Sequence, residues 1–589
     1  GYRAQSNRIY TGPVRIGDDA FVGVASVLDI DTVMEDGTQL GHASSLQSGQ
    51  RAFMGKRYHG SPAQVTTANF CDIDPKVCTP RRRGLYSAVQ LTSVLAIYMP
   101  LFLMTLYYLY SRLVGQLAGP EFDLEAPWAG LLSLAVPVLF ASATLFFGAL
   151  LVGLLIVGLV PRLLMPFLAK DKSYVLYGAH YAIYRTIALL SNSPVYNLLF
   201  GDSNYIVTYL RWAGYRLNTI VQTGSNFGCN QRHDNPFLCS VGSGTMVSDG
   251  LTMTNAVMSS SSFKLSEVKL GEKNYIGNRV HYPAGGKTGA NCLLGTKVMV
   301  PIDGPIRENI GLLGSPPFEI PRVVDRDKLA VGMLEGEARR QRIAKKVWHN
   351  SVTIVAFLLC HWLHFFVLLF AGYVGLLYYP VFGIWSLFAF SILASLFSIG
   401  FFSFVEHGSL GFKKLQPRLV SMYDDYFWTH ERYWKSSGHP LPSLFKGTPF
   451  KNVISRLLGV RLGKKVFDDG CSFFDKSLIE VGDYSNFNEL CVVHGHSLEE
   501  GIFKTDRINI GEGCTVGHAA FVHYGVRMGD NVLLAADSFL MKGESPDPGT
   551  TWRGNPAKAV GGIARQSPLV EIVLPSAVAP AAQTAEQCQ

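Results

Sequence analysis

Residues 16–49 read IGDDAFVGVASVLDIDTVMEDGTQLGHASSLQSG, and an aliphatic side chain returns at every sixth position. The recurring residues are Ile16, Val22, Leu28, Met34, Leu40 and Leu46. A period of six fits neither an α-helix nor an alternating strand, but it is typical of the hexapeptide parallel β-helix, in which each hexad forms one flat side of a three-sided prism. Glycine is frequent after the aliphatic residue, where the backbone must bend.

The same six-residue period returns twice further along the chain. It runs from Leu270 to Val300 and again from Ile510 to Leu540. Each of the three stretches ends in Gly-Ser-Pro or Gly-Asn-Pro, as a repeated unit would. These tripeptides begin at Gly60, Gly314 and Gly554. We therefore predict three left-handed parallel β-helices of the hexapeptide-repeat, acyltransferase-like kind.

Membrane segments are predicted between the β-helices. Charged residues make up only 16% of the 589-residue chain, which is low for a soluble enzyme. Four apolar stretches reach the roughly 20 residues that a membrane helix needs, and they come as two hairpins. They cover residues 86–110, 131–160, 351–379 and 381–405. The predicted fold is a multi-domain chain in which β-helices alternate with transmembrane α-helical hairpins.

Basic residues flank both hairpins. Arg81, Arg82 and Arg83 precede the first, and a basic linker at 331–350 precedes the second. The positive-inside rule places both hairpin turns outside, so we expect a multi-pass protein of the cell membrane, in contact with the lipid bilayer, with its β-helices on the cytoplasmic side. The net charge of +8 lies largely at these flanks, so no nucleic-acid partner is predicted.

The repeats divide the chain into modules of hairpin, linker and β-helix. The predicted segments are a first β-helix (1–70), a hairpin (71–172), a linker (173–217), a second β-helix (218–330), a basic linker (331–350), a hairpin (351–405), a linker (406–463), a third β-helix (464–563) and a flexible tail (564–589). The two aromatic-rich linkers are predicted as helices at the membrane interface or, alternatively, as helices packed between β-helix and membrane domain. Gly1 aligns with the middle of a module, so a further hairpin is expected ahead of it.

Cysteine usage predicts no metal site. The ten cysteines are scattered, with no CxxC pair and no Cys/His spacing suited to zinc. A reducing compartment is the simplest interpretation.

The stretch VVHGHSLEEG, residues 492–501, belongs to an insertion in the third β-helix. Val493 and Ile510 are 17 residues apart where one hexad would need six, and Met253 and Leu270 of the second β-helix have the same separation. In hexapeptide acyltransferases a histidine from an extruded loop removes a proton from the acceptor. The insertion is therefore the first place to look for a catalytic group.

His496 is the strongest candidate for a general base. Its GHS context resembles the G-H-P or T-H-P around the catalytic histidine of galactoside and maltose acetyltransferases. An imidazole has an unperturbed pKa near 6.5 and can take a proton from an attacking amine. Glu500 or Glu499 would orient it, or the loop is only a solvated surface segment. Further candidates for substrate binding are His494, Lys504, Lys264 and Glu499.

The second β-helix offers weaker candidates. His233 and Asp234 are adjacent in CNQRHDNPF, and Asp249 lies in SDGL. A His-Asp pair before a proline also serves simply to fix a turn. The alignment of the insertions sets Thr254 and Ala256 opposite the two histidines of the third copy, so a catalytic insertion is expected once only.

The chain resembles the C-terminal half of the epsilon-poly-L-lysine synthetase type of single-module, membrane-bound nonribosomal peptide synthetase in the motifs VASVLDIDT, LGHASSLQSG, SGTMVSDGL, TKVMVPIDGP and LLGSPPFEIPR. The resemblance implies two partners upstream, an adenylation domain and a carrier domain whose phosphopantetheine arm bears the aminoacyl thioester. Neither an adenylation signature nor a carrier serine motif is found in this sequence. The family also implies tandem acyltransferase-like domains that join a free amino acid or the growing peptide to that thioester.

We therefore expect an amide-forming acyltransferase with no cofactor of its own beyond the carrier's phosphopantetheine arm. Homologous soluble enzymes are trimers with active grooves between subunits, so three β-helices in one chain would form an intramolecular pseudo-trimer. Two other functions stay open: a non-catalytic membrane platform for carrier docking and polymer export, and a coenzyme A-dependent acetyltransferase.

Overall fold

The structure is a computed structural model that describes residues 1–105, 107, 111, 127–217, 227–321, 336–436, 441–499 and 501–560. Glu500 and the predicted tail at 564–589 lie outside the described residues.

Short parallel strands stack in the segment that begins the chain. β3 (Val14–Ile16) pairs with β6 (Thr32–Met34), β4 (Phe21–Val22) with β7 (Gln39–Leu40), and β5 (Val27–Leu28) with β8 (Ser45–Leu46). Val14 lies opposite Thr32, so one coil takes three hexads. The later aliphatic positions Met34, Leu40 and Leu46 are at most 1% exposed. The six-residue period therefore marks the side chains of a β-helical core.

Two further stretches form parallel ladders of the same kind, from β13 (Arg216–Leu217) to β25 (Phe318–Ile320) and from β27 (Arg461–Leu462) to β42 (Lys558–Ala559). Each carries its insertion as an antiparallel hairpin. In the second β-helix the hairpin is β18 (Ala256–Met258) and β19 (Ser262–Leu265), and in the third it is β33 (His496–Glu499) and β34 (Ile502–Thr505). A strand from the preceding linker completes each small sheet: β12 (Ser173–Val175) or β26 (Arg418–Ser421).

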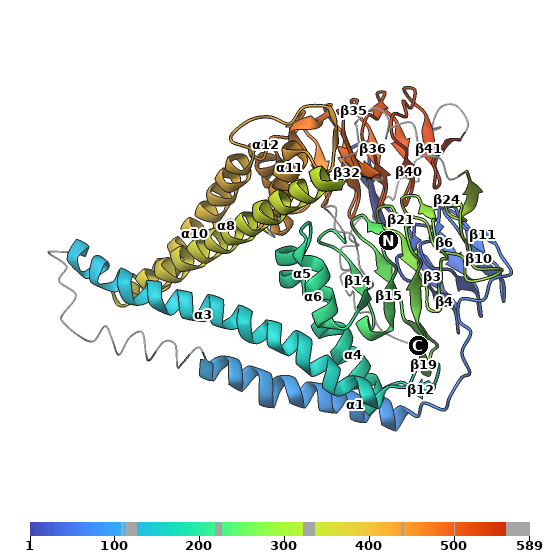
Figure 1. Ribbon diagram of the computed structural model, residues 1–589, viewed down its shortest axis with the longest axis horizontal. Coiled ribbons are helices and arrows are strands. Elements are labelled where there is room, and N and C mark those ends of the chain that lie inside the picture. Colours follow the sequence, from blue (N-terminus) through green and yellow to red (C-terminus); the bar gives the residue numbers. More distant parts are fainter. Residues whose placement is uncertain are drawn as a thin grey trace, which may run out of the picture.

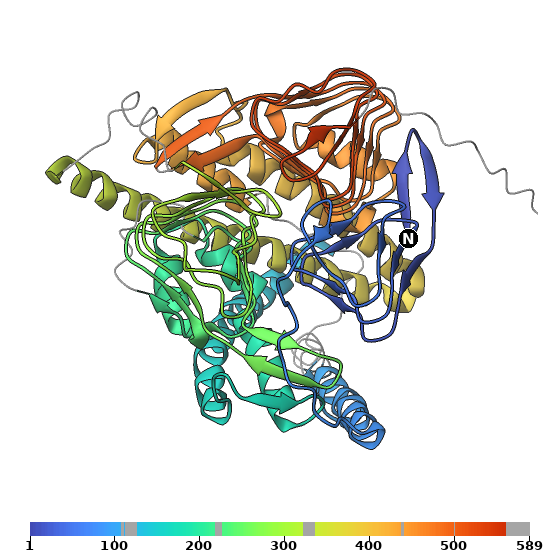
Figure 2. The same cartoon turned by 90° about the vertical axis from the view of Figure 1, so that its right-hand side faces the viewer.

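The three β-helices meet at a ring of backbone hydrogen bonds. Ser61 N donates to the carbonyl of Ser315, Ser315 N donates to that of Asn555, and Asn555 N donates to that of Ser61, each at 2.9 Å. These residues occupy the same place in the three closing tripeptides, so the ring has approximate threefold symmetry. Figure 2 shows the three coiled units grouped around one another. The described residues thus form a pseudo-trimer within one chain.

Four described helices are long and apolar enough to cross a membrane. They comprise α1 (Pro80–Ser93), which continues to Thr105, α3 (Pro127–Leu164), α8 (Gly336–Leu377) and α10 (Ile384–Ser409). α8 packs against both α3 and α10, and Figure 1 shows these helices reaching away from the β-helices to one side.

The linkers are packed helices. α4 (Ala179–Ser191) follows the first hairpin and α11 (Asp425–Ser436) follows the second. α11 contacts α8 and α10 on one side and the third β-helix on the other. Half of its residues are buried, including Phe427, Trp428 and the charged Glu431. α11 is therefore packed between the membrane helices and the third β-helix, which is the second of the two alternatives for the linkers.

Candidate active site

A cavity of about 580 Å³ lies between the second and third β-helices. Asp249 and Cys229 line it from the second, and His494 and His496 line it from the third. Trp434 of α11 also contributes to its wall. A cavity of this size, lined by residues of two neighbouring β-helices and by a histidine, is a candidate site for a small-molecule or carrier-bound substrate.

His496 is oriented by a buried carboxylate. Its Nδ1 lies 2.6 Å from Oδ2 of Asp475, a residue that is completely buried. Because a carboxylate only accepts hydrogen bonds, Nδ1 carries a proton, and the neutral form of this imidazole has its lone pair on Nε2. Burial acts to raise the pKa of Asp475, but the electrostatic and hydrogen-bond interactions with His496 and His430 outweigh it, and the pKa lies well below its usual value. The pair has the geometry of a general base with its orienting anion.

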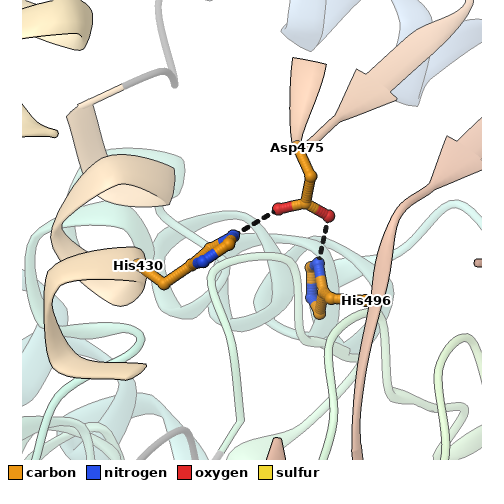
Figure 3. A group of neighbouring side chains, drawn as sticks. All are labelled: His430, Asp475 and His496. Carbon is orange, nitrogen blue, oxygen red and sulfur yellow. Dashed lines mark hydrogen bonds and ion pairs between the residues drawn. The ribbon is translucent and has the colours of Figure 1, made fainter. Parts of the chain in front are cut away.

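The linker helix α11 supplies the other partners of Asp475. His430 Nε2 lies 2.6 Å from Oδ1, and the indole Nε1 of Trp434 donates to the same oxygen at 2.9 Å. The Trp434 ring also stacks on His496, with centroids 4.0 Å apart. Figure 3 shows His430 and His496 approaching Asp475 from different elements, each to its own oxygen. Three N–H groups therefore fix the carboxylate.

A metal ion is the other ligand to consider at this cluster. The candidate donor atoms of His430, Asp475 and His496 lie within 4.8 Å of one another. However, both histidines lie at hydrogen-bond distance from the carboxylate, and the second ring nitrogen of His430 is buried without a hydrogen-bond partner among the described residues. A metal-binding histidine ordinarily donates that second N–H to a neighbour. The arrangement therefore fits proton transfer better than metal binding.

The other candidates of the third β-helix lie near this pair. His494 lines the cavity, and its Nδ1 donates to the carbonyl of His496 at 2.8 Å. Burial lowers the pKa of His494 well below its usual value, so it stays neutral. Glu499 pairs with Lys504 at 3.3 Å and with Lys542 at 2.9 Å. The structure thus places Asp475, rather than Glu499, against His496.

The candidates of the second β-helix are dispersed. His233 is buried with Nδ1 2.9 Å from the Tyr215 hydroxyl, and burial lowers its pKa to about 3. Asp234 instead accepts two backbone N–H groups, from Asn255 and Ala256 at the start of the inserted hairpin. These two side chains do not bond to each other in the described part of the chain.

Asp249 and Lys264 complete the set predicted from sequence. Asp249 lines the cavity and accepts the backbone N–H groups of Cys229 and Asn230, both at 2.9 Å. The ammonium of Lys264 donates to the backbone carbonyl of Asp72 at 2.9 Å. Among the predicted site residues of the second β-helix, Asp249 therefore faces the cavity together with His496.

Residues 13–49 and 507–542 match the family model described as the hexapeptide repeat of succinyl-transferase. The chain is 21% identical over 575 residues to the delta-poly-L-ornithine synthetase of Acinetobacter baumannii (strain AB307-0294). The match covers 94% of the chain. The chain is a relative of the poly-amino-acid synthetases. It spans 41% of the length of that synthetase.

Two solved acetyltransferases align with smaller parts of this poly-amino-acid synthetase relative. One is a maltose O-acetyltransferase from Clostridium difficile 630, 18% identical, with 27% of this chain and 98% of that one covered at a TM-score of 0.20. The other is a hexapeptide-repeat acetyltransferase from Vibrio cholerae, 17% identical, with 20% and 81% covered at a TM-score of 0.18.

Three members of the cluster were not predicted from the sequence: Asp475, His430 and Trp434. Asp475 carries a signal within the internal repeat, because it aligns with Asn235 and so differs between the copies. His430 and Trp434 lie in a different element and reach the site only through packing. Their aromatic-rich helix alone gave no reason to place them beside His496.

The second β-helix has the same scaffold as the third but lacks the His-Asp cluster. Phe263 and Phe503 occupy equivalent places and pair with Tyr174 and Val420 of the preceding linkers. Extending that alignment along the linker helices sets Tyr184 at the place of His430 and Ala188 at that of Trp434. Ala256 and Asn235 replace His496 and Asp475. The complete cluster therefore occurs in the third copy and not in the second.

Proposed function

We propose that this chain is the membrane-bound, amide-forming acyltransferase region of an iterative peptide synthetase. The observation that carries the proposal is His496, which is bonded to buried Asp475 and lines a cavity between two β-helices in a relative of the poly-amino-acid synthetases. The donor would be an aminoacyl thioester on the phosphopantetheine arm of a carrier domain. The acceptor would be the amine of a free amino acid or of the growing homopolymer, for which epsilon-poly-L-lysine is one candidate product.

The reaction follows from the tautomer that the contact with Asp475 selects for neutral His496. Its Nε2 removes a proton from the acceptor amine as the nitrogen attacks the thioester carbonyl, and Asp475 stabilises the imidazolium that forms. Collapse of the tetrahedral intermediate breaks the C–S bond. The imidazolium then returns the proton to the departing thiolate, so the products are an amide and a free thiol, and His496 is neutral again.

The membrane arrangement belongs to the same proposal. Basic residues lie at the β-helix ends of the hairpins, so we infer that the β-helices lie on the cytoplasmic side, where an upstream carrier and adenylation domain would also reside. Four described helices with the length and apolar composition of membrane spans support the membrane association.

The test is acyl transfer from a loaded carrier domain to free amino acid, measured for the wild type and His496→Ala. Loss of a general base lowers the rate by about a hundredfold to ten-thousandfold. His180→Ala is the matched control because that histidine is exposed on α4. Full activity of His496→Ala would support the alternative of a non-catalytic platform. Acetyl transfer from coenzyme A without any carrier would instead support an acetyltransferase.

A further inference from the structure

Two of the three N–H groups that bond to Asp475 come from the linker helix α11 and not from the third β-helix. His430 and Trp434 lie one helical turn apart on α11, so both point to the same side. Both donate to Oδ1 of Asp475, which leaves Oδ2 for His496. The orientation of the base therefore depends on where α11 lies.

α11 is fixed to the first helix of the second membrane hairpin. Glu431 forms an ion pair with Lys346 of α8, and both side chains are at most 2% exposed. Arg432 bonds to two further residues of α8, with Nη2 2.7 Å from His349 Nε2 and Nε 3.0 Å from Thr353 Oγ1. The residues on either side of this contact, His430 and Tyr433, face the third β-helix.

The second helix of that hairpin is tied to the residue next to Asp475. The ammonium of Lys476 lies 2.6 Å from both carboxylate oxygens of Glu406, which is near the end of α10 and 3% exposed. The backbone N–H of Lys476 donates to the Tyr433 hydroxyl of α11 at 3.3 Å. Asp475 is thus held between an anchor to α10 and two donors from α11.

We propose that His430 and Trp434 are positioning residues of the catalytic base, and that the hairpin α8–α10 keeps α11 in register, so that the site is competent only while this hairpin packs against the third β-helix. This inference rests on the proposed function of His496. A shift of about 1 Å in a catalytic group lowers rates markedly, so an anchor in the membrane domain can govern chemistry in the β-helix.

The second copy forms the same small sheet with neither an imidazole nor an indole at these places. α4 occupies the place of α11 with Tyr184 and Ala188 at the positions of His430 and Trp434, yet the linker strand and inserted hairpin form the same three-stranded sheet. His430 and Trp434 are therefore specific to the copy that contains His496. A role in packing alone would not require an imidazole and an indole N–H aimed at one carboxylate.

The first experiment compares His430→Gln with His430→Phe in the full chain, using the acyl-transfer assay. Gln retains an N–H donor for Asp475, whereas Phe retains the aromatic shape but no donor. We expect His430→Phe to lower kcat by about tenfold to a hundredfold with little change in the KM of the acceptor, since it removes a hydrogen bond to a charged carboxylate. His430→Gln should keep most of kcat. The reverse ranking would assign His430 to packing and overturn its positioning role.

The second experiment removes the α10 anchor with the double variant Lys476→Met/Glu406→Gln, which leaves no unpaired buried charge. We expect kcat to fall at least about tenfold while the melting temperature stays close to that of the wild type. Lys170→Met is the matched control, because it breaks a partly exposed ion pair of the second module with Glu267. Unchanged kcat in the double variant would overturn the dependence on the hairpin. Activity of His496→Ala would refute the proposed function itself, so the two failures are distinguishable.

Discussion

Asn235 and Asp475 occupy equivalent corners of successive β-helices, but only Asp475 faces a histidine. Each residue immediately precedes a 3-10 turn, Pro236–Leu238 or Lys476–Leu478, that leads into an equivalent strand. The side chain of Asn235 accepts the N–H of Phe237 in its own turn. Asp475 makes no such cap, and its two oxygens are directed to α11 and His496 instead. Equivalent positions therefore hold a capping side chain in one copy and, in the other, the carboxylate that bonds to His496.

Asp475→Asn is expected to lower the rate of acyl transfer by about a hundredfold to ten-thousandfold. The amide would donate to Nδ1 of His496 and so favour the tautomer that has its proton on Nε2, which cannot act as a base. Asn also tolerates the left-handed backbone of this position, where φ is 58°. The variant should therefore remain folded. The measurement is single-turnover transfer from a loaded carrier.

Asp483→Asn is the matched control for this substitution. Asp483 also belongs to the third β-helix, and it accepts the backbone N–H of Lys464 at 2.7 Å away from the residues that line the cavity. Equal rates for the two variants would mean that Asp475 has no part in the reaction. A specific loss in Asp475→Asn with an unchanged melting temperature would assign its effect to His496.

Much of the fold could be predicted because its signals are local. The six-residue period marks the one side chain on each flat side of a coil that points into the core. The separation of 18 residues between Val14 and Thr32 follows from three hexads per turn. The insertions were visible for the same reason, since they interrupt a regular count. The repeated tripeptides that contain Ser61, Ser315 and Asn555 indicated equivalent positions in the three β-helices. The hydrogen bonds between these residues are seen only in the tertiary structure.

The site was less predictable because its members come from distant elements. His496 could be chosen from its own insertion, but the sequence offered Glu499 and Glu500 as neighbours within the same loop. The structure instead gives Glu499 to two lysines and brings Asp475 to His496 across adjacent coils. His430 arrives from a linker helix 66 residues before His496 in the chain. Proximity in sequence is a poor guide where successive coils stack.

Gly60→Ala should weaken the junction between the first two β-helices. Gly60 has φ +108°, which disfavours any side chain, and a Cβ there would collide with the ring of Pro316 in the second β-helix. Gly49→Ala is the matched control, since Gly49 has φ +79° but no neighbouring atom within 4 Å of the added Cβ. We expect a loss of about 1–2 kcal/mol for the control and about 2–5 kcal/mol for Gly60→Ala in thermal or denaturant unfolding. Equal losses would show that the junction adapts without cost.

Lys297 should be important for the interface between the second and third β-helices. Its ammonium forms a buried ion pair with Asp537 and also donates to the carbonyls of Asp537 and Ala519, at 2.8 and 3.2 Å. Lys297→Met leaves Asp537 buried without its cation, so we expect a loss of about 3–5 kcal/mol in unfolding experiments. The double variant Lys297→Met/Asp537→Asn removes both charges and should recover most of that loss. A double variant as unstable as the single one would show that volume, not charge, sets the effect.

Acidification from pH 7 towards pH 4 should destabilise the pseudo-trimer through its buried histidines. Burial lowers the pKa of His42 and His59 to about 4, and that of His233 and His523 to about 3. In the unfolded chain these groups titrate near 6.5. Between these values the unfolded state binds more protons, so stability is complete above about pH 6.5 and falls as the pH decreases, by up to about 1.4 kcal/mol per pH unit for each histidine.

Asp475 affects stability in a different pH range from the buried histidines, so its contribution to stability can be separated from theirs. Its folded pKa is lowered, so its contribution is present above the unfolded value of about 3.9 and is lost only in more acidic solution. The test is thermal or denaturant unfolding at pH 7.5, 6.0 and 5.0 for the wild type and His42→Gln. We expect a shallower loss of stability with acidification in His42→Gln, because the variant has one fewer group that binds a proton more readily in the unfolded state than in the folded state. His180→Gln is the control, since His180 is exposed, and its pH dependence should match that of the wild type. Identical slopes for all three proteins would show that burial of His42 does not govern acid stability.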